Sequence, residues 1–419
     1  MRYSADWHDD AQNGALEERA TVADFRVWLN EQNVTLHLRE TESIDHVTVS
    51  LYGIVEGLVH DWWGLFGGRD QETSLRKYRN GFVVPDLRLQ FDGAVFEMSA
   101  HQCVYRNPNV RFWAGSSEIM DRATAEARLD RLIENVLERL AASGLRDTSA
   151  ALRWARVKAS RADADEATFC ESAGALGLDP YSLPNGDTAA IEEAAARFEG
   201  EPLAEFLAGA KGVNAQQLIN WVDSVERRAP SCAKVAELRA AVAEAVGRAP
   251  RRKLEESWKL GYRRARALRA TLNLKTVDRF QTYSSLAVKL GASHAFELAE
   301  SIDGLRALRS DHADGVRLHI RKAGSSHAAS THLFSFTRAV GDVACFPEQT
   351  RAPVNELKAA YRQAAGRAFA AEFLAPIDEV RSMRAEGRDS ISIANEFGVS
   401  VAVIEHQLEN QERVAAACT

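Results

Sequence analysis

The residue composition and the apolar patterning of the chain change near residue 150, and this change constrains the fold more than any other feature of the sequence. Up to about residue 145, segments such as VTLHLRE and LRLQFDGAVFEMSA alternate apolar and polar residues, as half-buried strands do. From Ala151 on, β-branched residues become scarce and Ala, Leu, Arg and Glu dominate, as they do in helices. The sequence therefore predicts an α+β fold that is predominantly helical.

Turn and cap residues divide the N-terminal part into elements. Asp92-Gly93 lies between two strand-like runs and predicts a hairpin with a two-residue loop. The apolar run VSLYGIVEGLVHDWWGLFGG predicts a buried helix that ends at Gly67-Gly68, and a clean amphipathic helix begins at Thr124. Trp62 and Trp63 in the first of these helices either belong to the core or form a binding platform.

Three domains are predicted from these patterns. Residues 1–147 form a mixed α/β domain with a β-hairpin, residues 148–250 form a helical region, and residues 251–419 form a C-terminal domain. In the helical region, SCAKVAELRAAVAEAVGR is interpreted as one of several helices.

Charge and cysteine content narrow the classes of function. The net charge of −7 gives no global electrostatic attraction to nucleic acid or to an anionic membrane. No stretch approaches the ~18 apolar residues of a membrane span, and the acidic, polar start MRYSADWHDD is unlike a signal peptide. The five cysteines are scattered and odd in number, which suits reduced thiols. We therefore expect a cytoplasmic protein without a cofactor and without a membrane partner.

A local basic segment, PRRKLEESWKLGYRRARALRATLNL, stands apart from this acidic average. Between Pro250 and Ala270 it carries eight Lys or Arg residues against two Glu. Arg263, Arg264 and Arg266 are candidate binding residues for phosphate or for an acidic partner. The alternative is a solvated helix face that pairs with neighbouring acidic side chains.

Several segments of the last ~110 residues resemble one family together. FTRAVGD, which ends at Asp342, resembles the FTLAHELGH helix of the IrrE/ImmA-like metallopeptidases, and AFAAEFLAP resembles their FAAELLMP-type helix. ISIANEFGVSVAVIEHQLEN is similar to their C-terminal helix pair with its GVS turn, and AGALGLDPYSL is similar to a helical region in longer members. The resemblance implies a zincin-like C-terminal domain, and the family cleaves helix-turn-helix repressors.

The catalytic positions of that family are replaced in this chain. Arg338 stands at the first His, Ala339 at the general-base Glu and Asp342 at the second His, while Gln363 and its neighbours stand where the third ligand is expected. A zincin helix needs two His four residues apart for the metal and a Glu beside the first for the proton. The resemblance therefore implies a degenerate metallopeptidase without catalytic residues.

Two arrangements are considered for these substituted residues. Arg338 and Asp342 are four residues apart and can form a salt bridge in place of the metal, or both can be partly exposed surface groups. A relocated metal site would have to use His319, His327, His332 and Asp342, although the spacings of the histidines are not diagnostic.

The C-terminal helix pair has the spacing of a helix-turn-helix but lacks its charge. Residues 390–411 contain no Lys or Arg and three Glu, whereas DNA readers need cations for phosphates. We therefore expect a packing module there. The family resemblance, together with the replaced catalytic residues, implies a non-catalytic regulatory protein. By that analogy it binds a repressor-like or toxin–antitoxin partner in stress response, phage defence or mobile-element regulation. A DNA-associated regulator using residues 251–269 and a metallopeptidase with a relocated metal site are the alternatives.

Overall fold

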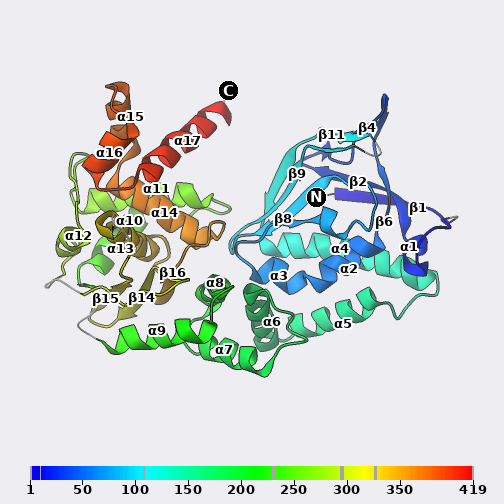
Figure 1. Ribbon diagram of the computed structural model, residues 1–419, viewed down its shortest axis with the longest axis horizontal. Coiled ribbons are helices and arrows are strands. Elements are labelled where there is room, and N and C mark those ends of the chain that lie inside the picture. The colour runs from blue at the N-terminus through cyan, green and yellow to red at the C-terminus, as the bar shows by residue number, and fades with distance from the viewer. Residues whose placement is uncertain are drawn as a thin grey trace. The chain divides into compact units, whose positions relative to one another are not determined.

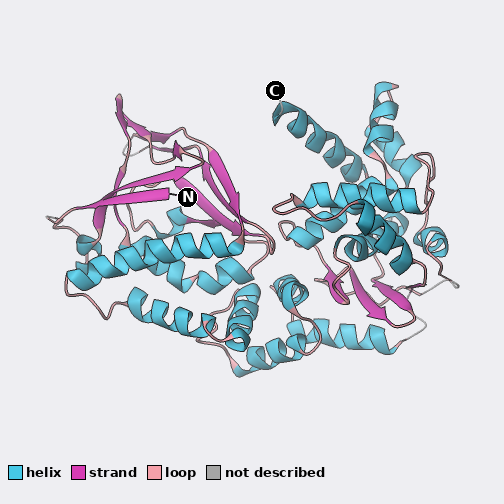
Figure 2. Ribbon diagram, turned by 180° about the vertical axis from the view of Figure 1, so that it is seen from behind, coloured by secondary structure: helices cyan, strands magenta, loops and turns pink. Residues whose placement is uncertain are grey.

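The computed structural model describes residues 2–9, 11–106, 109–228, 233–292, 297–324 and 328–417. The chain forms two compact units, residues 1–185 and residues 186–419 (Figure 1). The fold is α+β and mostly helical, with small antiparallel sheets (Figure 2), and this confirms the predicted class at that level. Within the described residues, no helix combines the length and the apolar character that crossing a bilayer requires.

The first unit is built on three antiparallel sheets. Its strands are β1 (Arg2–Trp7), β2 (Val22–Leu29), β3 (Gln32–Asn33), β4 (His37–Arg39), β5 (Glu42–Ile44), β6 (Val47–Ser50), β7 (Thr73–Ser74), β8 (Asp86–Phe91), β9 (Phe96–His101), β10 (Cys103–Tyr105), β11 (Val110–Phe112) and β12 (Ser116–Met120). The first sheet has the order β1-β2-β3, with β6 also paired to β2. The other two have the orders β10-β11-β4-β5 and β12-β9-β8-β7.

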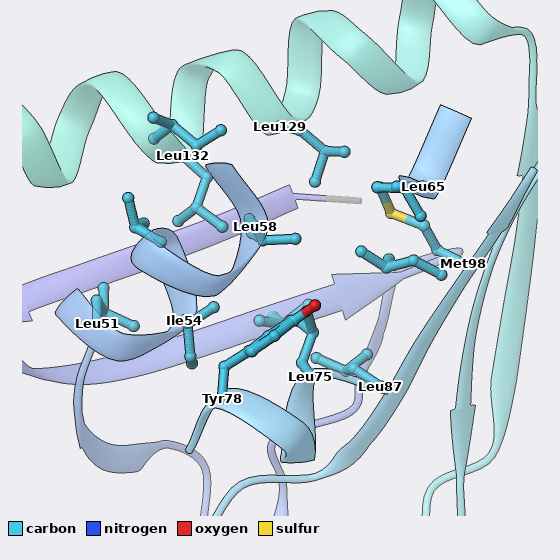
Figure 3. Packing of buried hydrophobic residues seen from close by; sticks show 14 of the residues in the cluster. Leu51, Ile54, Leu58, Leu65, Leu75, Tyr78, Leu87, Met98, Leu129 and Leu132 are labelled. Atoms are coloured by element: carbon cyan, nitrogen blue, oxygen red, sulfur yellow. The ribbon is translucent and has the colours of Figure 1, made fainter. Parts of the chain in front are cut away.

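Helices cover these sheets and complete one core. They are α1 (Leu16–Ala20), α2 (Tyr52–His60), α3 (Trp62–Gly67), the 3-10 helix η1 (Leu75–Tyr78), α4 (Arg122–Ala142), α5 (Ser149–Arg161) and α6 (Ala164–Leu176). Figure 3 shows Leu129 and Leu132 of α4 facing Leu58 of α2, with Leu87 and Met98 of the sheet in the same cluster. The helices predicted before Gly67 and from Thr124 are confirmed, although Asp61 divides the first into α2 and α3.

The hairpin predicted around Asp92-Gly93 is present, because β8 and β9 pair antiparallel, but its loop differs from the prediction. Phe91 pairs with Phe96, so the loop has four residues, 92–95, and not two. The carboxylate of Asp92 accepts the backbone N–H groups of Ala94 at 2.8 Å and Val95 at 2.7 Å. Only the predicted loop length was wrong, because the Asp92 side chain closes its own turn and the loop extends beyond the Asp-Gly pair.

The unit boundary lies within the predicted helical region 148–250. α5 and α6 belong to the first unit, where α6 crosses α3 closely. Two glycines permit the approach, since a Cβ on Gly174 would overlap the backbone of Trp63 and one on Gly67 would overlap the carbonyl of Glu171. The predicted limits at 147/148 and 250/251 therefore do not coincide with the boundary at 185/186.

The second unit surrounds one small sheet with helices. Its strands are β13 (Ala233–Val235), β14 (Ala307–His312), β15 (Gly315–Ile320) and β16 (Arg351–Val354), in the antiparallel order β13-β15-β14-β16. Its helices are α7 (Asn185–Ala195), α8 (Gly200–Ala210), α9 (Ala215–Arg227), α10 (Leu238–Arg248), α11 (Ser257–Thr271), α12 (Tyr283–Lys289), α13 (Ala328–Cys345), α14 (Tyr361–Leu374), α15 (Ile377–Ala385), α16 (Ser390–Phe397) and α17 (Val401–Ala417).

α13 is the central helix of this unit. It contacts β14, β15 and β16 as well as α11 and α14, and most of its side chains are buried. The helices expected at FTRAVGD and at AFAAEFLAP are present as α13 and α14, and α14 ends at Leu374. The segment SCAKVAELRAAVAEAVGR is partly wrong as a helix, because residues 233–235 pair with β15 and α10 begins only at Leu238.

Candidate functional site: a pocket and a buried charge network

One face of α13 lines an open pocket of about 470 Å³ in the second unit. Thr331, Phe334, Ser335 and Arg338 lie three or four residues apart, so they project from the same side of the helix. The remaining lining residues are Ser330, Arg306, Arg321, Ala323, Gly324, Glu356, Arg367, Ser400 and Val403. The residue at the expected first His position thus lies at a pocket, as a reactive group of a peptidase would.

Arg338 is held by groups on the segment that follows β16 and on α14. Its side chain is only 4% exposed, and its guanidinium lies 3.3 Å from the carboxylate of Glu356. It also donates to the carbonyl of Asn355 and, at 3.1 Å, to the side-chain oxygen of Gln363. Burial and the charge of Arg367 lower the pKa of Arg338 to about 10. Arg338 therefore stays a cation at neutral pH.

Asp342 does not pair with Arg338, and the predicted salt bridge between them is wrong. Its carboxylate lies 3.0 Å from the guanidinium of Arg309 on β14 and also accepts from Arg362 on α14. The alternative of two partly exposed surface groups is wrong as well, because Arg338 and Asp342 are both buried. Both residues contact α14, but Arg338 also reaches the segment after β16, whereas Asp342 reaches β14.

Gln363 joins the Arg338 site to a buried carboxyl group on α8. Its side-chain nitrogen donates to Glu205 at 2.7 Å and to the carbonyl of Pro353 at 3.0 Å. Its oxygen accepts the backbone N–H of Asn355 at 3.0 Å. Burial raises the pKa of Glu205 to about 7, although the charge of Arg362 acts in the opposite direction. Both the amide oxygen and the amide nitrogen of Gln363 are thus engaged within the unit.

These residues do not fit the zinc that the family resemblance implies. A catalytic zinc site takes three His, Glu, Asp or Cys ligands. Here a guanidinium occupies the first position, and the one carboxylate, Asp342, is bound by two arginines. Ala339 offers no base to activate water.

The fallback histidines do not form a ligand cluster within the described residues. His319 is buried, both its ring nitrogens have no hydrogen-bond partner in the described part of the chain, and burial lowers its pKa to about 4. The Nε2 atom of His332 accepts the N–H of Ala323 at 2.8 Å. His327 lies outside the described residues. Across those ranges, no group of three or more His, Cys, Asp or Glu is placed to hold a metal.

The candidate arginines of α11 make contacts within their own unit. Arg263 binds Glu255 through two atoms, both at 2.7 Å, and Arg266 binds Glu372 at 2.6 Å. Arg264 is buried, which lowers its pKa. Of the three side chains only Arg266 is about half exposed, at 52%. A nucleic acid would have to compete with internal carboxylates for two of these cations.

Trp62 and Trp63 are core residues of the first unit. Their exposed fractions are 0% and 1%. The ring of Trp62 lies 5.0 Å from that of Trp154, and the indole N–H of Trp63 donates to the hydroxyl of Tyr181 at 3.1 Å. Because neither indole reaches the surface, the binding platform is wrong for this pair.

The C-terminal helix pair packs on the rest of the second unit. α16 ends at Gly398, whose φ of +66° is a left-handed conformation that glycine favours. On α17, Ile404 is buried and Gln407 donates to the carbonyl of Ala375 at 3.1 Å. This geometry agrees with the predicted packing role.

Sequence reasoning missed most partners in this network: Arg309, Arg362, Glu205, Asn355 and Glu356. Two of them left a signal, since Arg309 interrupts a buried strand and Glu205 interrupts the apolar helix EPLAEFLAGA. A charged residue in such a position needs a partner elsewhere in the fold. In comparisons with known proteins, no family model, curated protein or solved structure matches this chain.

Proposed function

We propose that the second unit is a degenerate zincin-like domain of the IrrE/ImmA-like type, which binds a polypeptide partner without hydrolysing it. The observation that carries this proposal is the Arg338 site. The four catalytic positions hold Arg338, Ala339, Asp342 and Gln363, and three of them form a buried network in place of reactive groups. The pocket beside them is open, so a polypeptide can still bind there although the catalytic groups are replaced.

The partner class comes from the family analogy and not from site chemistry. On that analogy the partner is a repressor-like protein or a component of a toxin–antitoxin pair. The protein then acts in the regulation of a stress response, phage defence or a mobile element.

A photo-crosslinking residue at Phe334 tests this proposal directly. Phe334 is half-buried and lines the pocket. With the full chain in its own cells, we expect one polypeptide to crosslink from this position and to be recovered intact. Mass spectrometry identifies it, and elemental analysis of the purified protein measures the metal content.

The same crosslinker at Val288 is the matched control. Val288 belongs to α12 in the same unit, is 65% exposed and is not among the pocket residues. Equal crosslinking from both positions, or cleavage of the trapped polypeptide together with stoichiometric metal, would overturn the proposal.

A further inference from the structure

The pocket on α13 is strongly biased in charge. Among the described residues that line it, Arg306, Arg321, Arg338 and Arg367 are cationic and only Glu356 is anionic. This bias opposes the acidic average of the whole chain, whose net charge is −7. A concentration of one sign of charge in a pocket raises the local concentration of the opposite sign.

One carboxylate oxygen serves two of these arginines. The same oxygen of Glu356 lies 2.6 Å from Arg306 and 3.3 Å from Arg338. Arg321 also lies 3.8 Å from Asp303, which is 94% exposed and is not among the lining residues. Among the described residues of the lining itself, one carboxylate, Glu356, is set against four guanidinium groups.

The arginines also disfavour one another's charge. The pKa of Arg321 is lowered mainly by burial and next by the charge of Arg306. The pKa of Arg338 is lowered mainly by burial and next by the charge of Arg367. An anion placed among them would relieve this repulsion. Its electrostatic gain is greater in a partly dehydrated pocket than on an open surface.

Arg338 and the hydroxyl groups near it add hydrogen-bond donors to the lining of the pocket. Arg338 is 4% exposed, and its buried Nε atom has no hydrogen-bond partner in the described part of the chain. Hydroxyl groups of Thr331 and Ser335 line the same pocket and can donate to an anion. Ser400 and Val403 bring the N-terminus of α17, which favours negative charge, to its wall.

We propose that this arginine-lined pocket binds carboxylate groups of an acidic segment in the polypeptide partner. The inference rests on the proposed function and specifies the chemistry of what is bound. Guanidinium groups are opposite in charge to carboxylates, and their planar geometry allows two parallel hydrogen bonds to a carboxylate. A pocket of about 470 Å³ has the size of a small-ligand site, which suits a few side chains of an extended segment.

Fluorescence anisotropy with a labelled hexaglutamate peptide tests this inference on the full chain. We expect binding that weakens as ionic strength rises. The double variant Arg306→Gln/Arg321→Gln should bind about tenfold more weakly or worse. Arg248→Gln is the control, because Arg248 is an exposed arginine on α10 outside the pocket.

A second variant keeps the test valid if removing arginines harms folding. Thr331→Glu adds a carboxylate to the pocket without deleting a guanidinium, and it should also weaken peptide binding. Failure of hexaglutamate to bind, or unchanged binding by both variants, overturns the inference. Binding of inorganic phosphate, measured by calorimetry, without any binding of hexaglutamate would establish an anion site and overturn the polypeptide ligand. Crosslinking from Phe334 in that case would still support the proposed function.

Discussion

At the scale of single residues, the second unit is unusual for its buried charges. Arg309, Arg338 and Arg362 are at most 4% exposed, and Asp342 and Glu205 are buried beside them. Isolated ions at such depth cost several kcal/mol, so each must be offset by a partner. Asp342 is the most shared of these partners, because it binds two of the three arginines.

Replacing Asp342 tests this dependence. Asp342→Asn would remove one of two anionic partners from each of two buried guanidinium groups, since Arg309 keeps Asp311 and Arg362 keeps Glu205. We expect a loss of about 3 kcal/mol in the free energy of unfolding. Chemical denaturation at neutral pH measures the loss. Asp303→Asn is the control, because Asp303 is 94% exposed and should matter little. A loss below about 1 kcal/mol for Asp342→Asn would show that the network is not structural.

Glu205 makes stability depend on pH. Its pKa is raised from 4.5 to about 7, so between these values the folded state binds more protons than the unfolded state. Stability from this group is therefore highest at low pH and declines as pH rises toward 7. Relative to the wild type, Glu205→Gln should gain stability from pH 5 to pH 8, by at most about 3 kcal/mol.

Unfolding curves of both proteins across this pH range measure the difference. Because the two proteins share their other titrating groups, the difference isolates Glu205. A constant difference across the range would contradict the raised pKa.

At the scale of elements, much of the fold was accessible from sequence. Periodic apolar stripes and stop signals predicted α4, α13, α14 and the α16–α17 pair. β13 was missed because its three residues lie in an Ala-rich stretch and become a strand only through pairing with β15. Likewise, Arg338, Asp342 and Gln363 could be singled out from short motifs that resemble a known family, but Glu205 lies 158 residues from Gln363 in sequence. Local sequence patterns cannot predict partners that lie so far apart in the chain.

The crossing of α11 and α14 gives a prediction at this scale. A Cβ on Gly261 would lie 2.5 Å from the carbonyl oxygen of Ala365 and 2.8 Å from the Cβ of Ala368. Gly261→Ala should therefore force the helices apart and destabilise the protein by about 1–3 kcal/mol. Gly247→Ala on α10 is the control, because nothing lies within 4 Å of that position. It should change stability little or raise it by up to about 1 kcal/mol. Thermal or chemical unfolding compares the two variants.

At the scale of the whole molecule, the chain is organised as two compact units with separate sets of contacts. The sequence suggested a break near residue 147, where the strand-like texture ends. The structure places the break at 185/186, since α5 and α6 pack on α2 and α3. Local residue composition indicates whether a segment forms a strand or a helix. The limits of a unit depend instead on which elements share a core.

Two fragments test this organisation. Residues 1–185 and residues 186–419 should each fold alone and unfold cooperatively, because each contains its own core. Circular dichroism and thermal melting of the separate fragments measure this. A fragment that lacks a cooperative transition would contradict the division.

Glu356 has a consequence for the strength of any anion binding. It is 59% exposed, and although burial opposes its ionisation, Arg338 and Arg306 lower its pKa, so it stays charged. A carboxylate that binds in the pocket must compete with Glu356 for Arg306 and Arg338. Glu356→Gln should therefore tighten hexaglutamate binding severalfold, whereas Glu348→Gln outside the pocket should not. Glu356 thus lowers the affinity of the pocket for anions, which suits a partner that has to be released.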